Sequence, residues 1–154
     1  EITGIENSLS FVYQQFYDFQ INATYQDMIN KSKVGYNGLP DNSYNSRIPN
    51  EPYLFANLRT GFNFFTTNYQ KVTLHLSSHY VEKYYLYSED SGNKDENRQI
   101  PEQLTHDIDI GYSINHDEFN LGFTASNITD ETVFDNYNIQ KPGRAYYLKF
   151  RYAL

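Results

Sequence analysis

Apolar and polar residues alternate one by one along most of the chain, and this period of two constrains the fold more than any other feature. It is cleanest in "HDIDIGYSI", where Ile108 and Ile110 alternate with Asp107 and Asp109. A period of two places successive side chains on opposite faces of a β-strand. The pattern recurs seven times, and the expected strands cover residues about 3–14, 19–31, 53–65, 71–87, 103–114, 118–127 and 146–154.

The connections between these strands alternate in length. Short turns follow the first, third and fifth strands, whereas long stretches rich in Gly, Asn, Ser and Pro follow the second, fourth and sixth. This asymmetry is typical of outer-membrane barrels, which have long outer loops and short periplasmic turns. The strands are also about ten residues long or more, which is the length a tilted strand needs to cross a bilayer. We therefore expect an all-β fold, an antiparallel up-and-down meander of about seven long strands within a transmembrane β-barrel.

The composition agrees with this expectation and excludes other classes. The chain has 16 Tyr and 11 Phe, which favour strands over helices. No run of about 18 apolar residues is present, so a membrane-spanning helix is excluded. The net charge of -7 argues against a general nucleic-acid binder, and the absence of Cys excludes a disulfide scaffold.

Three stretches of the chain resemble a known family. "RIPNEPYLFANLRTGF" and "IPEQLTHDIDIGYSI" look like strand entries of TonB-dependent outer-membrane receptors, and "FNLGFTASNITDETVFDNYNIQKPGRAYYLKFRYAL" is similar to their C-terminal segment. The three motifs occur in the family's order, and the resemblance covers essentially the whole chain. The abundance of Tyr and Asn resembles members from Bacteroidetes.

The resemblance implies a much larger protein. Receptors of this family form a 22-stranded barrel around an N-terminal plug, so residues 1–154 are expected to be a C-terminal part, with the plug domain and earlier strands absent. The chain begins with Glu1 and shows no signal peptide, which also favours a processed chain or a piece of one. The implied location is the outer membrane of a Gram-negative bacterium.

The resemblance also implies a function, which is active transport of a scarce nutrient such as an iron chelate, haem or vitamin, energised through TonB. The implied partners are the rest of the receptor (its plug and earlier strands), the TonB complex acting through that plug, outer-membrane lipid or lipopolysaccharide, the barrel-assembly machinery, and a surface lipoprotein. The closing strand resembles the signal read by the assembly machinery, through Tyr147, Phe150, Tyr152 and Leu154. Lys149 and Leu154 depart from the commonest residues of that signal.

Polar residues on alternate strand positions are expected to face the barrel lumen. His75 and His79 share a strand face but lie about 13 Å apart, too far to hold one metal ion, so we interpret them as polar filler. The expected lumen-facing polar residues are Arg59, His75, His79, Asp107, Asp109, Lys149 and Arg151.

Asp107 and Asp109 lie about 7 Å apart on one face, a spacing that in principle suits a paired acid and base. With no nucleophile motif nearby, we favour salt bridges from these carboxylates to Arg59, Lys149 or Arg151. The acidic loop at residues 89–96 lacks EF-hand spacing and is expected to be solvated. The sequence therefore predicts no enzyme, no cofactor and no metal site.

Any ligand contacts are expected in the long loops. Aromatic and charged residues there could stack on and hydrogen-bond a ligand at the barrel mouth, namely Tyr36, Tyr44, Arg47, Tyr85 and Tyr87. Two alternatives stay open from the sequence. One is a soluble carbohydrate-binding β-sandwich, and the other is a structural outer-membrane subunit that pairs with another chain through its sheet edges.

Overall fold

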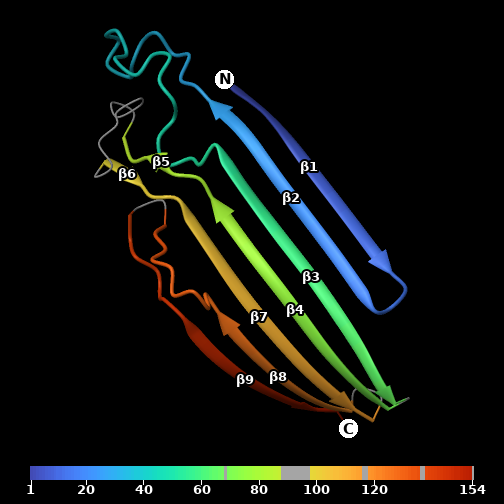
Figure 1. The fold of residues 1–154 in the computed structure, drawn as a ribbon. Coiled ribbons are helices and arrows are strands. Elements are labelled where there is room, and N and C mark those ends of the chain that lie inside the picture. Colours follow the sequence, from blue (N-terminus) through green and yellow to red (C-terminus); the bar gives the residue numbers. More distant parts are fainter. Residues whose placement is uncertain (68, 88–97, 116–117, 136–137, 154) are drawn as a thin grey trace.

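The computed structural model describes residues 1–67, 69–87, 98–115, 118–135 and 138–153, and its main feature is one antiparallel sheet (Figure 1). Seven long strands form this sheet in the order β1-β2-β3-β4-β7-β8-β9, so each long strand pairs with the next one in the chain. Their bounds are β1 (Ile2–Tyr13), β2 (Tyr17–Met28), β3 (Leu54–Thr67), β4 (Gln70–Val81), β7 (Gln103–Ile114), β8 (Phe119–Ser126) and β9 (Ala145–Tyr152). The predicted meander of seven long strands is confirmed. The total of 22 strands rests on the TonB resemblance and stays a prediction.

The two ends of the sheet differ, as the alternating loop lengths predict. The segments after β2, β4 and β8 gather at one end, which we call the loop end, and the short connections lie at the other, the turn end (Figure 1). The first short turn begins at Gln14, which has a φ of 52°. This left-handed conformation is not that of a strand, so β1 ends at Tyr13, one residue earlier than predicted. No helix in the described ranges is long and apolar enough to cross a membrane.

The register places the two kinds of side chain on opposite faces. One face, the polar face, carries a row of directly paired residues across five strands: Asp18, Gly61, His75, Asp109 and Thr124. The other, the apolar face, carries the neighbouring row Tyr17, Phe62, Leu74, Ile110 and Phe123. A slip of one residue in any pair would exchange the two faces, so the alternation specifies the register.

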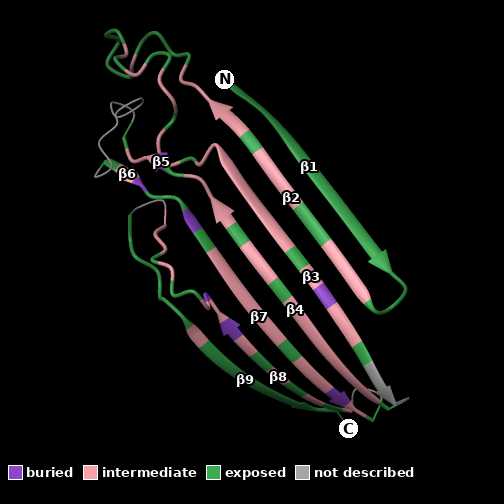
Figure 2. Ribbon diagram, in the orientation of Figure 1, coloured by how far each residue is buried: buried purple, intermediate pink, exposed green. Residues whose placement is uncertain are grey.

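No second layer covers either face of the sheet in the described residues. On the apolar face Leu148 is 74% exposed and Phe150 70%, and β1 is exposed along its whole length (Figure 2). Large apolar side chains in contiguous exposure are characteristic of surfaces that meet another apolar phase or partner. The predicted alternative of a β-sandwich needs two packed sheets, and it is therefore wrong for this part of the chain.

The fourth strand is shorter than predicted, and a small ribbon takes its place. β4 ends at Val81 rather than Tyr87, and β5 (Tyr84–Tyr85) pairs with β6 (Gln99–Ile100) in a separate two-stranded sheet. The last bond to the long sheet is from the Glu82 amide to the Leu54 carbonyl, at 2.9 Å. The Tyr85 carbonyl then accepts from the Asn50 amide at 2.8 Å, so contact with a distant loop redirects the chain.

Candidate functional site at the loop end

The best-buried side chains of the described residues lie mostly at the loop end, not in the middle of the sheet (Figure 2). Ile100 of β6 is fully buried, and Tyr84 of β5 is 5% exposed. Gln103, at the start of β7, is 4% exposed and accepts a hydrogen bond from the Phe134 amide at 2.9 Å. The bond between Phe134 and Gln103 joins the loop after β8 to the start of β7. We call Tyr84, Ile100 and Gln103 the loop-end core. Sequence reasoning missed it, because residues 84–85 and 99–100 are too short to show a period.

A hollow of about 350 Å³ lies among these loops. Its lining comes from four segments of the chain and includes Asn50, Tyr84, Gln103, Phe134 and Lys141. Burial raises the pKa of the Tyr84 phenol, and the carboxylates of Asp135 and Glu51 raise it further. The phenol therefore stays protonated at neutral pH and can act as a hydrogen-bond donor.

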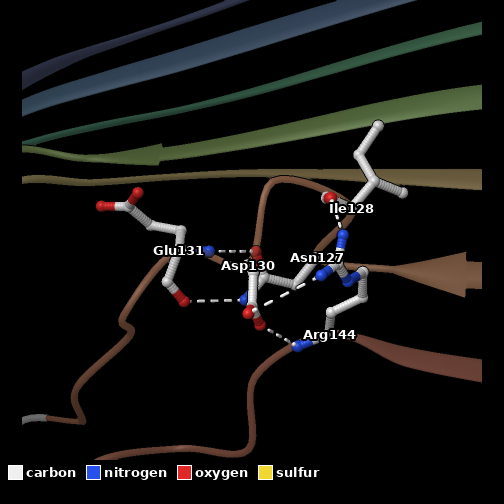
Figure 3. Close-up of polar contacts among 5 residues, drawn as sticks. All are labelled: Asn127, Ile128, Asp130, Glu131 and Arg144. Carbon is white, nitrogen blue, oxygen red and sulfur yellow. Dashed lines mark hydrogen bonds and ion pairs between the residues drawn. The ribbon is translucent and has the colours of Figure 1, made fainter.

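The loop after β8 is held by a network that begins directly at the strand end (Figure 3). The Asn127 side chain accepts from the Glu131 amide at 2.9 Å and donates to the Glu131 carbonyl at 2.8 Å. Asp130 Oδ1 accepts from the Arg144 amide at 2.9 Å, and the Arg144 guanidinium donates to the Ile128 carbonyl at 3.3 Å. We call Asn127, Asp130, Glu131 and Arg144 the loop latch, because they join the two ends of the loop.

Gly143 stands next to the loop latch, and the latch requires glycine at this position for a steric reason. A Cβ atom at this position would lie 2.6 Å from Asp130 Oδ1, far inside van der Waals contact. The Asp130 carboxylate can therefore reach the Arg144 amide only over a residue without a side chain. The stretches "NITDE" and "PGR", which carried the family resemblance, thus have a structural role in closing this loop.

Asp107 is bonded to the same loop, and this corrects a prediction. Asp107 Oδ1 accepts from the Asn127 amide at 2.7 Å and from Ser126 Oγ at 3.0 Å, while Asp109 Oδ1 accepts from Thr124 Oγ1 at 2.6 Å. Within the described ranges neither carboxylate forms the ion pair that was expected with Arg59, Lys149 or Arg151. The neighbouring strand β8 offers hydroxyl and amide donors directly opposite, so these shorter contacts satisfy the carboxylates.

The predicted lumen-facing set shares one face of the sheet. The strand register places all of its members on the polar face: Arg59, His75, His79, Asp107, Asp109, Lys149 and Arg151. His79 Nδ1 shares a 2.6 Å hydrogen bond with Asn57 Oδ1, and Asn57 in turn donates to Asn22 at 2.9 Å. His79 is therefore one member of a polar chain that crosses three strands. No cluster of three potential metal ligands occurs among the residues that the structure describes.

The five predicted ligand residues all lie at the loop end, but they differ in exposure and in the contacts that they make. Tyr36 and Tyr87 are exposed, and Tyr44 has the Lys33 ammonium 5.8 Å from its ring centre. Arg47 lies 4.5 Å over the Tyr53 ring and 3.1 Å from Asp27 Oδ1, an ion pair too bent for a hydrogen bond. Tyr85 is part of the β5–β6 ribbon.

The closing-strand residues divide between the faces. Tyr147 lies opposite Thr124 on the polar face, whereas Phe150 and Tyr152 lie on the apolar face, where Tyr152 stacks on Phe119 at 4.6 Å. Leu154 and the acidic loop at 89–96 lie outside the described residues.

Comparisons with known proteins agree on the kind of protein but not on the expected family. The family model described as type IX secretion system membrane protein PorP/SprF matches residues 41–154. Among solved structures, the ferric yersiniabactin uptake receptor FyuA from Yersinia pestis matches with a TM-score of 0.67 and 14% identity, over 96% of this chain and 21% of the receptor. No curated protein matches the sequence. The chain spans about a fifth of the length of the FyuA receptor, and at 14% identity the likeness shows the fold alone.

These findings confirm an outer-membrane β-barrel in a Gram-negative bacterium and correct the family. The TonB-receptor resemblance rested on strand entries and on the stretches that form the loop latch. These stretches pair strands and close a loop. They are therefore features of barrel architecture, which different barrel families share, and they do not distinguish one family from another.

Proposed function

The chain belongs to the PorP/SprF family of type IX secretion system membrane proteins, and on that premise we propose that it forms barrel wall and surface loops of a secretion component in the outer membrane. The proposed role is non-enzymatic and needs no cofactor. The observation that carries the proposal is the family match over residues 41–154, which includes the loop latch and the whole loop-end core.

The sheet geometry supports a wall that separates lipid from water. The apolar face, with Ile110 and Leu121 at 44% and 47% exposure, would meet lipid, and the polar face would line the lumen. In outer-membrane barrels the long loops lie on the extracellular side. The loop end would therefore face the medium and the turn end the periplasm.

We propose that the loop end contacts a protein partner of secretion at the cell surface. The loop after β2 bonds to the segment after β4 through the Asn50 amide and the Tyr85 carbonyl, and the loop after β8 bonds to the start of β7 through the Phe134 amide and Gln103. These bonds favour a preformed surface. Tyr36 and Tyr87 stand exposed on it, and exposed tyrosines are frequent anchors of protein interfaces. Surface lipoprotein, lipopolysaccharide and the barrel-assembly machinery remain proposed partners, the last through β9.

Nutrient uptake energised through TonB is the second candidate, favoured by the fold likeness to an uptake receptor. It requires a plug and TonB contact, and it predicts that deletion of the gene impairs growth on limiting iron chelate or haem.

The experiment is deletion of the gene in its source bacterium, followed by complementation with the intact protein. Secretion predicts that a set of exported proteins disappears from the medium and returns with the intact gene, while growth on limiting iron chelate or haem is unchanged. Complementation with a Tyr36→Ser, Tyr87→Ser double variant should restore barrel assembly but less export. A matched control is Ile139→Ser, which also lies exposed in a loop but removes an aliphatic group. Normal export together with lost nutrient uptake would contradict the proposal and support uptake.

A further inference from the structure

A second hollow, of about 320 Å³, opens on the polar face toward the turn end of β4, β7, β8 and β9. Its floor includes Gly111 and Gly122, which lie directly opposite each other on neighbouring strands. Three cationic side chains line it, those of Lys71, Lys149 and Arg151. No carboxylate side chain is among the described residues that line it.

The strand register explains why the cations surround the glycines. One row of paired residues runs Thr73, Gly111, Gly122, Lys149, and the next runs Lys71, Ser113, Asn120, Arg151. Lys149 and Arg151 are two residues apart on one strand, about 7 Å, and Lys71 lies three strands away, about 14 Å across the sheet. Long side chains from both sides can therefore converge over the glycine floor.

The glycine at position 122 is not required by the backbone. Its φ is not positive, and among the described residues a Cβ atom there would meet only Lys149 Cβ, at an ordinary 3.8 Å. Gly111 differs, because its Cβ would lie 2.5 Å from Thr73 Oγ1. Glycine weakens a strand and often marks a place where a ligand or backbone approaches closely. Since nothing in the packing demands Gly122, its effect is to keep the hollow open.

The local charge is opposite to that of the chain. Asp and Glu outnumber Lys and Arg by 19 to 12, yet among the described residues the charged side chains that line this hollow are all cationic. Arginine presents a rigid fork of donors that matches carboxylate and phosphate oxygens, and lysine adds a compact charge. Rings of such cations inside pores select anions and phosphates.

We propose that this hollow is a binding site for a small polyanion that carries carboxylate or phosphate groups. The anion rests on the Gly111–Gly122 floor, where the absent side chains admit it, and it is held by Arg151 and Lys149 from one side and Lys71 from the other. The site lies on the wall opposite the apolar face and is separate from the loop-end surface.

The test uses the intact outer-membrane protein that carries this chain, purified in detergent, with calorimetric titration of pyrophosphate and of citrate at low salt. Gly122→Leu fills the hollow without removing a charge, and the Lys149→Gln, Arg151→Gln double variant removes charge without filling it. Arg59→Gln is the matched control, because Arg59 is a cation on the same face outside the hollow. Heat-modifiable mobility on gels verifies that each variant forms a barrel.

We expect binding to the intact protein and to Arg59→Gln. Binding should weaken about tenfold or more in the double variant, which loses two charge-assisted contacts, and by a similar factor in Gly122→Leu, where the leucine occupies the place of the anion. Binding of pyrophosphate alone would assign a phosphate ligand, and binding of citrate alone a carboxylate ligand. Absence of binding by both probes, or equal binding in all variants, would overturn the proposal. If Gly122→Leu does not form a barrel, the double variant decides. Lys149 and Arg151 are both exposed, so their replacement disturbs no packed core.

Discussion

The long strands and the loop end are stabilised by different means. Along the strands most side chains are exposed or half-buried, and order comes from backbone ladders between neighbours in the chain. At the loop end Ile100 is fully buried and Asn127 is 6% exposed, held by contacts between segments distant in sequence. The comparison teaches that most strand positions need only a side chain of the right class for their face, whereas the buried loop-end positions depend on particular residues and partners.

The largest effect is expected from reversing polarity on the lipid side of a strand. Ile110→Arg should destabilise the full barrel by about 2–4 kcal/mol if the position is near the bilayer midplane. Asp109→Asn should cost much less, because an amide oxygen can still accept from Thr124 Oγ1. Heat-modifiable mobility after urea titration measures both. The facing assignment would be reversed if Asp109→Asn unfolds the barrel while Ile110→Arg leaves it intact.

A smaller effect is expected from truncating the buried residue of the loop-end core. Ile100→Ala should loosen the β5–β6 ribbon by about 2 kcal/mol, at the low end for buried aliphatic truncations because the ribbon is short. Trypsin cleavage after the exposed Lys83 should then accelerate while the barrel stays folded. Ile139→Ala is the matched control, because Ile139 is 62% exposed in another loop. Equal acceleration in both variants would show that Ile100 holds no core.

The loop latch should contribute less, because it is partly exposed. Asp130→Ala removes the acceptor of the Arg144 amide and should destabilise the loop locally by about 1 kcal/mol. Asp130→Asn keeps an oxygen at that place and should lose less. Hydrogen exchange at the Glu131 and Arg144 amides measures the effect. Unchanged exchange in Asp130→Ala would mean that Asn127 alone closes the loop.

The smallest effect is expected from acid titration in the loop after β2. Hydrogen bonds from the Ser43 hydroxyl and amide, and then from Asn30, lower the pKa of Asp41 from its usual 3.8. A lowered pKa means that ionised Asp41 stabilises the loop above pH 3.8, and this stabilisation is lost as pH falls through the lower folded value. Exchange of the Ser43 amide, corrected for its intrinsic rate, should therefore accelerate only in acid. Asp41→Asn should show no such step, and a step in that variant would assign the titration to another group.

Most of the sheet could be predicted from the sequence, whereas the loop-end contacts could not. The facing of Ile110 and Asp109 follows from alternation, and the order of the seven strands follows from the lengths of the connections. The predicted end of β4 was wrong by six residues. The aromatic pattern continues through "YYLY", but in the structure the Tyr85 carbonyl is already bonded to the Asn50 amide. The partners expected for Asp107 were also wrong, since a carboxylate's donors depend on which residues the register places opposite it.

The sequence by itself therefore determined the long strands, their order, their two faces and the alternation of loop lengths, because each of these is a property of neighbouring residues. Only the tertiary structure decided that Ile100 is buried, that Asp107 accepts from Asn127 twenty residues away, and that Gly143 admits the Asp130 carboxylate. It also decided that Lys71 and Arg151, eighty residues apart, line one hollow. Such contacts depend on which segments the folded sheet brings together, and no local period in the chain records them.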